Sequence, residues 1–281
     1  MVRIRYSFGS RHTGKIKNIA KQRKEFPEIV NEVIRISDII LEVLDCRFIN
    51  KTRNLALEEC VKWMNKKIIF VLNKADLVEI NEIKKSIKKE IKPFVFVSSK
   101  NGYGAKDLRN KIKIEAKRIK IDNKERIQIG IIGYPNTGKS SLINLLARKG
   151  SAKISKQAGF TKGIQKIRFT KDILLLDTPG VIPNEEYSAS QEKIIKHTEV
   201  GARTFSDVKN PEEVVAHLIK DNLKVIEKFY NINSSGDPEK LIEEIGKKKN
   251  LLRKKGEVDT DRTSRKILRD WQEGKITPSL D

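Results

Sequence analysis

Short apolar segments alternate with longer segments of helical periodicity between Ile39 and Asp177. The apolar segments predict β-strands at Ile39–Leu44, Lys67–Asn73, Phe94–Ser98, Arg126–Ile132, Ile164–Phe169 and Ile173–Asp177. The periodic segments predict helices at Thr52–Asn65, Glu79–Ile91, Ala105–Lys120 and Gly138–Lys149. Because this alternation is typical of βαβ units, we expect an α/β fold with a doubly wound, mostly parallel sheet.

The pattern changes after Pro183, where no further strand is indicated and helix-start signals appear instead. Asn210 and Asp237 each precede a proline, and Asp259 precedes a basic amphipathic stretch. Such residues favour the first turn of a helix. We therefore predict an α/β domain over residues 1–183, with a basic arm at residues 1–24, and an all-helical domain over residues 184–281.

Charge is the most unusual feature of the composition. The 281 residues include 59 Lys and Arg against 37 Asp and Glu, a formal net charge of +22, which favours an anionic partner. No apolar run approaches the roughly 18 residues of a membrane-spanning helix. The basic N-terminus lacks the apolar core of a secretory signal, and two cysteines suit a reducing compartment. We therefore expect a cytoplasmic protein with no membrane partner.

The segment from Gly133 to Ser140 matches G-x-x-x-x-G-K-[ST] and lies between a predicted strand and a predicted helix. This pattern indicates a phosphate-binding loop, in which backbone N–H groups surround the phosphates at a helix N-terminus. Lys139 is then expected to reach the β- and γ-phosphates as a catalytic residue, and Ser140 to ligate Mg²⁺. The predicted nucleotide-binding residues here are Tyr134, Pro135, Asn136, Thr137, Gly138, Lys139, Ser140 and Ser141.

Two further motifs select guanine as the base. Asn73, Lys74 and Asp76 belong to an Asn-Lys-Ala-Asp sequence at the end of a predicted strand, where α/β sheets bind ligands. The Asp76 carboxylate only accepts hydrogen bonds, so it suits the N1–H and N2–H₂ donors of guanine. Another strand end carries Ser98, Ser99 and Lys100, and we expect these residues to join the same nucleotide site.

A third motif concerns the γ-phosphate and its metal ion. Asp177-Thr178-Pro179-Gly180 follows the apolar run at 173–176, so Asp177 is expected to hold Mg²⁺ through water. The Gly180 N–H is expected to meet the γ-phosphate. Thr161, in the sequence Gly-Phe-Thr-Lys-Gly, is the candidate second hydroxyl ligand of Mg²⁺. We therefore count Thr161 and Gly180 with Lys139 as catalytic residues.

The order of these motifs is rotated relative to Ras-like GTPases, because the motifs at 73–76 and 98–100 precede the loop at 133–140. The order resembles that of circularly permuted GTPases. Over nearly the whole chain the sequence resembles the YlqF/RbgA family of ribosome-assembly GTPases, including its archaeal members. Asp45-Cys46-Arg47 stands where that family has Asp-Ala-Arg, and Thr52-Arg53-Asn54 where it has an Asn-rich turn.

The resemblance implies a circularly permuted P-loop GTPase domain followed by a helical domain, and GTP hydrolysis coupled to assembly of the large ribosomal subunit. Val181 occupies the position of the water-orienting Gln of Ras, so we expect slow hydrolysis by the isolated protein. The resemblance further suggests Asn136 as a ligand of K⁺ beside the phosphates. It suggests His12 as a catalytic residue, although Arg11 departs from the family's Gly at the preceding position.

The C-terminal region carries a predicted RNA-binding surface. On a helical projection of residues 262–271, the cations fall opposite Ile267, Leu268 and Trp271. Cations on such a face suit phosphate contacts, which dominate affinity for nucleic acid. The predicted RNA-binding residues are Lys247, Lys248, Lys249, Arg253, Lys254, Lys255, Arg262, Arg265, Lys266 and Arg269.

These observations predict a monomeric GTPase whose partners are GTP or GDP, ribosomal RNA and the large ribosomal subunit. Mg²⁺ accompanies the nucleotide, and K⁺ is expected to assist. Two alternatives remain open. The protein could be a nucleotide-dependent RNA-binding switch with negligible hydrolysis, or a GTPase acting on tRNA or another polyanion.

Overall fold

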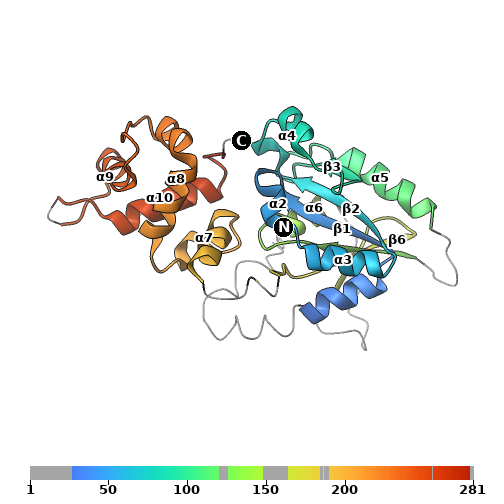
Figure 1. The fold of residues 1–281 in the computed structure, drawn as a ribbon. Helices are drawn as coiled ribbons and strands as arrows, with labels where there is room; N and C mark the ends of the chain where they lie inside the picture. The colour runs from blue at the N-terminus through green and yellow to red at the C-terminus, as the bar shows by residue number, and fades with distance from the viewer. Residues whose placement is uncertain are drawn as a thin grey trace, which may run out of the picture. The chain divides into compact units, whose positions relative to one another are not determined.

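The computed structural model describes residues 27–119, 126–147, 164–183, 186, 190–254 and 256–278. The chain divides into two compact units, Met1–Tyr187 and Ser188–Asp281. The division therefore falls after Tyr187, a little later than the boundary after Pro183 that the helix-start signals suggested. Figure 1 shows the sheet in the first unit and the helices α7 to α10 in the second.

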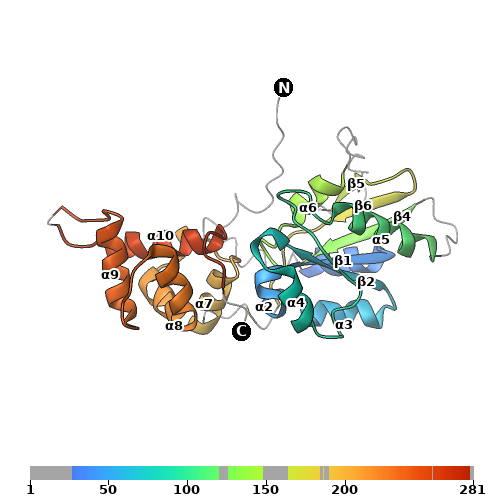
Figure 2. The same ribbon diagram turned by 90° about the horizontal axis from the view of Figure 1, so that it is seen from above.

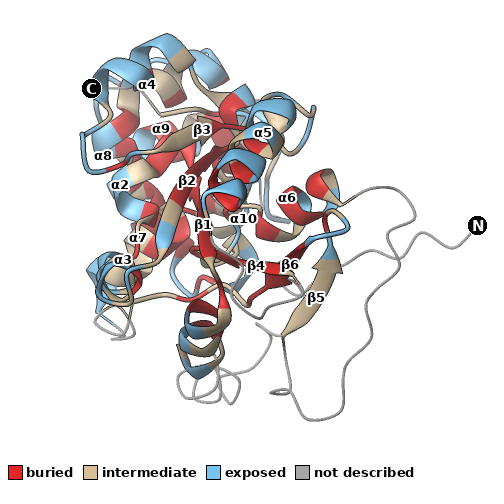
Figure 3. Cartoon of the chain, turned by 90° about the vertical axis from the view of Figure 1, so that its right-hand side faces the viewer, coloured by how far each residue is buried: buried red, intermediate tan, exposed pale blue. Residues whose placement is uncertain are grey.

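The first unit is built on a six-stranded sheet with the strand order β3-β2-β1-β4-β6-β5. Five strands run parallel, as predicted, and they are β1 (Ile39–Asp45), β2 (Lys67–Asn73), β3 (Phe94–Phe96), β4 (Ile127–Ile132) and β6 (Ile173–Asp177). The edge strand β5 (Gln165–Arg168) pairs antiparallel with β6. Every residue of β1 and β6 is buried, as expected for strands covered on both faces (Figure 3).

Helices cover both faces of this sheet, which confirms the doubly wound α/β fold. They are the helix at 27–36, α2 (Ile49–Thr52), α3 (Leu55–Trp63), α4 (Ile80–Ser86), α5 (Ala105–Lys117) and α6 (Lys139–Leu146). On one face, Leu108 of α5 and Leu142 of α6 pack with Leu41 of β1. On the other face, Ile34 and Val61 pack with Ile40 and Ile132 of the strands.

Several predicted elements are shorter than the sequence pattern suggested, and three of them are informative. The expected helix Thr52–Asn65 is two helices, because Arg53 is extended and the Asn54 side chain accepts a hydrogen bond from Leu57 N and so caps α3. Glu42 draws Asn54 into this position by accepting its backbone N–H at 3.0 Å. α4 ends at Ser86 rather than Ile91, and β3 ends at Phe96 rather than Ser98.

The second unit is helical in its described part, as predicted. Its helices are α7 (Gln191–Glu199), α8 (Pro211–Tyr230), α9 (Pro238–Lys248) and α10 (Thr260–Gln272), seen together in Figure 2. The Asp237 side chain caps α9 and the Asp259 side chain caps α10, so both start signals are confirmed. α7 was not predicted from the sequence. Its N-cap residue, Ser190, makes no side-chain cap hydrogen bond. None of the helices described is both long and apolar enough to span a bilayer.

Candidate nucleotide site

The phosphate-binding loop connects β4 to α6 and contains left-handed or similarly rare backbone conformations. Gly133, Asn136 and Gly138 have φ of 145°, 60° and 96°. A Cβ atom at Gly133 would lie 2.5 Å from the carbonyl oxygen of Val43, and one at Gly138 would lie 2.2 Å from Nδ2 of Asn73. The two glycines therefore let the loop approach the neighbouring strand ends more closely than any other residue would allow.

Lys139 and Asp177 form the charged centre of the loop, and both side chains are buried. Lys139 Nζ donates to the carbonyl oxygens of Gly133 at 3.0 Å and Tyr134 at 2.8 Å. Burial lowers the pKa of Lys139, and the negative charge of Asp177 opposes that shift. Burial likewise raises the pKa of Asp177, against the effect of Lys139. Each group thus carries a charge that burial disfavours, as expected of a site prepared for a charged ligand.

Asp177 and Gly180 lie beside the phosphate-binding loop. Within the described ranges, Oδ1 of Asp177 is buried and has no hydrogen-bond partner, so a carboxylate oxygen remains available for a cation shell. A Cβ atom at Gly180 would lie 2.7 Å from Cα of Pro135 and 2.9 Å from Nζ of Lys139. The DTPG segment therefore touches the phosphate-binding loop, and this donor set fits Mg²⁺ with Ser140 as the second oxygen ligand.

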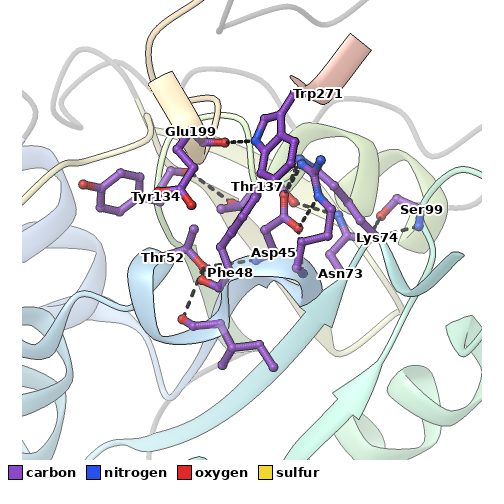
Figure 4. A network of polar contacts seen from close by, with 12 residues as sticks. Asp45, Phe48, Thr52, Asn73, Lys74, Ser99, Tyr134, Thr137, Glu199 and Trp271 are labelled. Atoms are coloured by element: carbon purple, nitrogen blue, oxygen red, sulfur yellow. Dashed lines mark hydrogen bonds and ion pairs between the residues drawn. The ribbon is translucent and has the colours of Figure 1, made fainter. Parts of the chain in front are cut away.

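Asn73 joins the guanine motifs to the phosphate-binding loop (Figure 4). Its Nδ2 donates to the carbonyl oxygen of Thr137 at 2.8 Å. Its Oδ1 accepts from the backbone N–H of Ser99 at 3.1 Å and from the Ser99 hydroxyl at 2.9 Å. One buried side chain therefore holds together three segments that are distant in the sequence.

Asp76 is exposed and lies at the start of a short 3₁₀ helix, η2 (Ala75–Leu77). The Ser98 hydroxyl donates to Oδ1 of Asp76 at 2.6 Å, which orients the carboxylate of this exposed residue. Lys100 is exposed and follows the half-buried Ser99. The structure thus brings the two predicted base-binding segments to the same end of the sheet.

Several predicted site residues lie outside the described residues or are characterised mainly by their degree of burial. Thr161, His12, Lys255 and the arm at residues 1–24 lie outside the described residues. Pro135 is half-buried, whereas Asn136 and Ser141 are exposed beside the loop. Val181 is buried in an apolar cluster with residues of the helix at 27–36 and of α3, so its side chain cannot orient a water molecule.

The sequence analysis assigned no role to Asp45 or to Glu42, although both carboxylates are buried in β1. Asp45 accepts hydrogen bonds from Arg47 and from Lys74 of the guanine motif. Glu42 accepts the backbone N–H of Asn54. The available signal was the presence of acidic side chains in an otherwise apolar strand, since buried charges are rare unless they are paired.

The predicted RNA-binding residues differ in their exposure and in their pairing with acidic side chains. Lys247, Lys248, Lys249, Arg253 and Lys254 are exposed around the end of α9. In α10, Ile267, Leu268 and Trp271 are fully buried, as the projection predicted. Three of the opposing cations have acidic partners within that helix or directly after it, namely Arg265 with Asp261, Lys266 with Asp270 and Arg269 with Glu273. Arg262 is exposed.

Comparison with known proteins finds relatives that are described as GTP-binding proteins or GTPases. The model of a family described as 50S ribosome-binding GTPase matches residues 128–252. An uncharacterised GTP-binding protein of Methanocaldococcus jannaschii is 39% identical over 253 residues, which cover 89% of this chain and 65% of that protein. Nucleolar GTP-binding protein 2 of Saccharomyces cerevisiae is 33% identical over 262 residues, which cover 91% of this chain and 53% of that protein. The chain thus spans between about half and two thirds of the length of these relatives.

Two solved structures of YlqF from T. maritima have the same fold. The GDP-bound form aligns with a TM-score of 0.64 and 24% identity, covering 90% of this chain and 98% of YlqF. The GNP-bound form aligns with a TM-score of 0.64 and 23% identity.

The sheet, the phosphate-binding loop and the rotated motif order together define a P-loop GTPase domain with circularly permuted connectivity. More particularly, the chain has the fold of YlqF, with a helical C-terminal unit, and the curated relatives that it matches are GTP-binding proteins.

Proposed function

We propose that this protein binds GTP and GDP with Mg²⁺ and hydrolyses GTP to GDP and phosphate. The observation that carries the proposal is the hydrogen-bonded arrangement of Asn73, Thr137 and Ser99, which holds the base-reading and phosphate-binding segments together. Ser98 orients the Asp76 carboxylate, which would accept hydrogen bonds from the donor edge of guanine. Adenine offers no matching pair of donors, so its binding would leave that carboxylate unpaired.

The chain's own residues suggest how the reaction is assisted. Lys139 is already desolvated, so its ammonium would exchange two carbonyl contacts for phosphate oxygens when nucleotide enters. Ser140 and, through water, Asp177 would hold Mg²⁺, which neutralises phosphate charge when bound. Gly180 would direct its N–H to the γ-phosphate.

We expect slow hydrolysis by the isolated protein, because Val181 is buried in the position of the missing Gln. The proposal includes three further roles. These are Thr161 as a Mg²⁺ ligand, Asn136 as a K⁺ ligand and His12 as a catalytic residue.

We further propose that the GTP cycle acts in assembly of the large ribosomal subunit through binding of ribosomal RNA. Two independent observations support this step: the net charge of +22, with an exposed cationic cluster at the end of α9, and the description of the matching family as ribosome-binding. Phosphate contacts of this kind need no base-specific side chains.

Nucleotide binding and turnover test the enzymatic part. Fluorescence titration should detect GDP and GTP but not ADP, and turnover should rise when large ribosomal subunits are added at matched K⁺ and Na⁺ concentrations. Nucleotide binding with no turnover under either condition would favour the alternative of an RNA-binding switch.

Co-sedimentation tests the partner. With a non-hydrolysable GTP analogue, we expect the protein to migrate with large ribosomal subunits in a sucrose gradient, whereas tRNA added in excess should not displace it. Recovery only at the top of the gradient in every nucleotide state would contradict the ribosomal role, and displacement by tRNA would favour the other alternative.

A further inference from the structure

The turn that follows β1 forms a buried ion pair next to the guanine motif. Asp45 ends β1 and lies opposite Asn73 in the register with β2. Arg47, in the short 3₁₀ helix η1 (Cys46–Phe48), donates its backbone N–H and Nε to Oδ1 of Asp45, at 3.0 and 3.1 Å, and Nη2 to Oδ2 at 2.8 Å. The Asp45 and Arg47 side chains are only 0% and 1% exposed. The carboxylate is therefore held rigidly from one side.

Lys74 contacts the same carboxylate, and Figure 4 shows the two side chains together. Its Nζ donates to Oδ2 of Asp45 at 2.7 Å, across 29 residues of sequence. Lys74 has a left-handed backbone conformation with φ of 62°, which is uncommon for a lysine. Its neighbour Asn73 binds the phosphate-binding loop, so both the backbone and the side chain of this lysine are constrained before any ligand arrives.

The charges in this cluster explain why such a constraint would serve a nucleotide. Arg47 already forms an ion pair with the Asp45 carboxylate, so Asp45 can hold the ammonium of Lys74 without fully cancelling its positive charge. A free lysine side chain samples many rotamers, and ordering it in advance removes that entropic cost from binding. Burial of an ion pair is itself costly, so its presence at the motif points to a role other than stability.

We propose that Asp45, held by Arg47, is a positioning residue that fixes the Lys74 side chain for the guanine nucleotide and thereby raises nucleotide affinity. The inference rests on the proposed function, because Lys74 matters in this way only if a guanine nucleotide binds between Asp76 and the phosphate-binding loop. It assigns a role to the Asp-Cys-Arg sequence, which does not itself touch the expected ligand.

A double-mutant cycle on GDP affinity tests this inference. We expect Asp45→Asn and Lys74→Ala each to weaken GDP binding roughly tenfold, and the double variant to bind no more weakly than Lys74→Ala alone. A purely structural role of Asp45 would instead give additive losses. Additive losses, or unchanged affinity in Asp45→Asn, would overturn the inference.

Two controls keep the test decisive. Cys46→Ala changes a buried residue of the same turn and should leave GDP affinity unchanged, with folding monitored by thermal denaturation. Asp45→Asn leaves Arg47 buried without its counter-charge, so this variant could fail to fold. In that case Asp45→Glu replaces it, because Glu retains the charge but displaces the carboxylate. The same non-additivity with Lys74→Ala is expected. Failure of the unaltered protein to bind GDP would overturn the proposed function itself, whereas additive losses overturn only the positioning role.

Discussion

Asp76 shows how one side chain can determine the chemistry of a binding site. Its carboxylate is exposed, carries only acceptors, and is oriented by the Ser98 hydroxyl at 2.6 Å. Ser98 in turn follows β3, the strand next to β2, so the orientation depends on the sheet rather than on the four-residue motif alone. Base selectivity is therefore the property of the site that a single substitution should change most clearly.

We predict that Asp76→Asn weakens GDP binding at least about tenfold, since the amide can satisfy only one of the two guanine donors as an acceptor. The same variant should gain affinity for xanthosine diphosphate, whose 2-oxo group accepts from the new amide. Competitive fluorescence titration measures both effects. Asp172→Asn, an exposed position in the turn between β5 and β6, should change neither affinity. An unaltered preference for guanine in Asp76→Asn would contradict the assignment.

Glu42 should make stability depend on pH. Burial, followed by the negative charge of Glu58, raises the pKa of Glu42 to about 8. The folded state then holds its proton more tightly than the unfolded state, so the contribution of Glu42 to stability is greatest below about pH 4.5 and falls as the pH rises toward 8. Glu42→Gln should therefore stabilise the protein at pH 8 by about 1–3 kcal/mol and change little at pH 5.

Thermal denaturation between pH 5 and 8 measures this difference. The exposed Glu59→Gln, on the same helix as Glu58, is the matched control and should leave the pH dependence unchanged. Equal stabilisation by Glu42→Gln at both ends of the range would exclude a role for the Glu42 proton.

The motif residues could be predicted from the sequence, because Gly133, Lys139, Asp76 and Asp177 stand at spacings that a single loop or strand end enforces locally. The bond between Asp45 and Lys74 could not be predicted, since it depends on β1 and β2 being neighbours in the sheet. The burial of Val181 was likewise inaccessible, although its apolar side chain already excluded an interaction with water.

At the scale of elements, local signals and tertiary contacts decide different features. The acidic caps of α9 and α10 act within one turn of helix, so those starts were predictable. The break between α2 and α3 arises because a buried carboxylate of β1 binds Asn54, a contact that helical periodicity does not reveal. The amphipathic pattern of α10 predicted its buried face but not the pairing of its cations with acids one turn away.

Lys247 and Arg253 of the cluster at the end of α9 also pair with acids, but their side chains are 66% and 57% exposed, against 29% and 37% for Arg265 and Lys266 of α10. The greater exposure suggests that the cluster at the end of α9 contributes most to RNA binding. Replacing Lys247, Lys248 and Lys249 together by Gln should weaken binding to ribosomal RNA and reduce the slope of log affinity against log salt by up to about three. A filter-binding or fluorescence titration over a range of salt concentrations measures the slope. The matched control replaces the exposed Lys85, Lys88 and Lys89, at and just after the end of α4, and removes the same charge. Equal effects of both triple variants would indicate a response to net charge alone.

At the scale of the whole molecule, the permuted order connects the nucleotide site to the helical unit. The DTPG motif ends at Gly180, whose backbone touches the phosphate-binding loop, and the first unit ends soon afterwards at Tyr187. In this order, the segment that would respond to the γ-phosphate continues directly into the helical unit. A change in nucleotide state therefore has a short covalent path to that unit.

We predict that the GDP-bound and GTP-analogue-bound proteins differ in the orientation of the helical unit. Small-angle X-ray scattering of the two forms should give different profiles, and a variant with a flexible glycine-serine insertion after Tyr187 should lose the difference. Identical profiles for the unaltered protein in both states would contradict this coupling.

The sequence by itself determined the class of fold, the permuted motif order and the residues of the phosphate-binding and base-reading segments. These depend on spacing, strand and helix periodicity and capping, which are interactions between residues close together in the chain. Only the tertiary structure decided that Asn73 links three motifs, that Asp45 contacts Lys74 and that burial shifts the pKa values of Lys139 and Asp177. Those features arise because parallel strands bring distant segments together and remove water from between them, and no local pattern records that outcome.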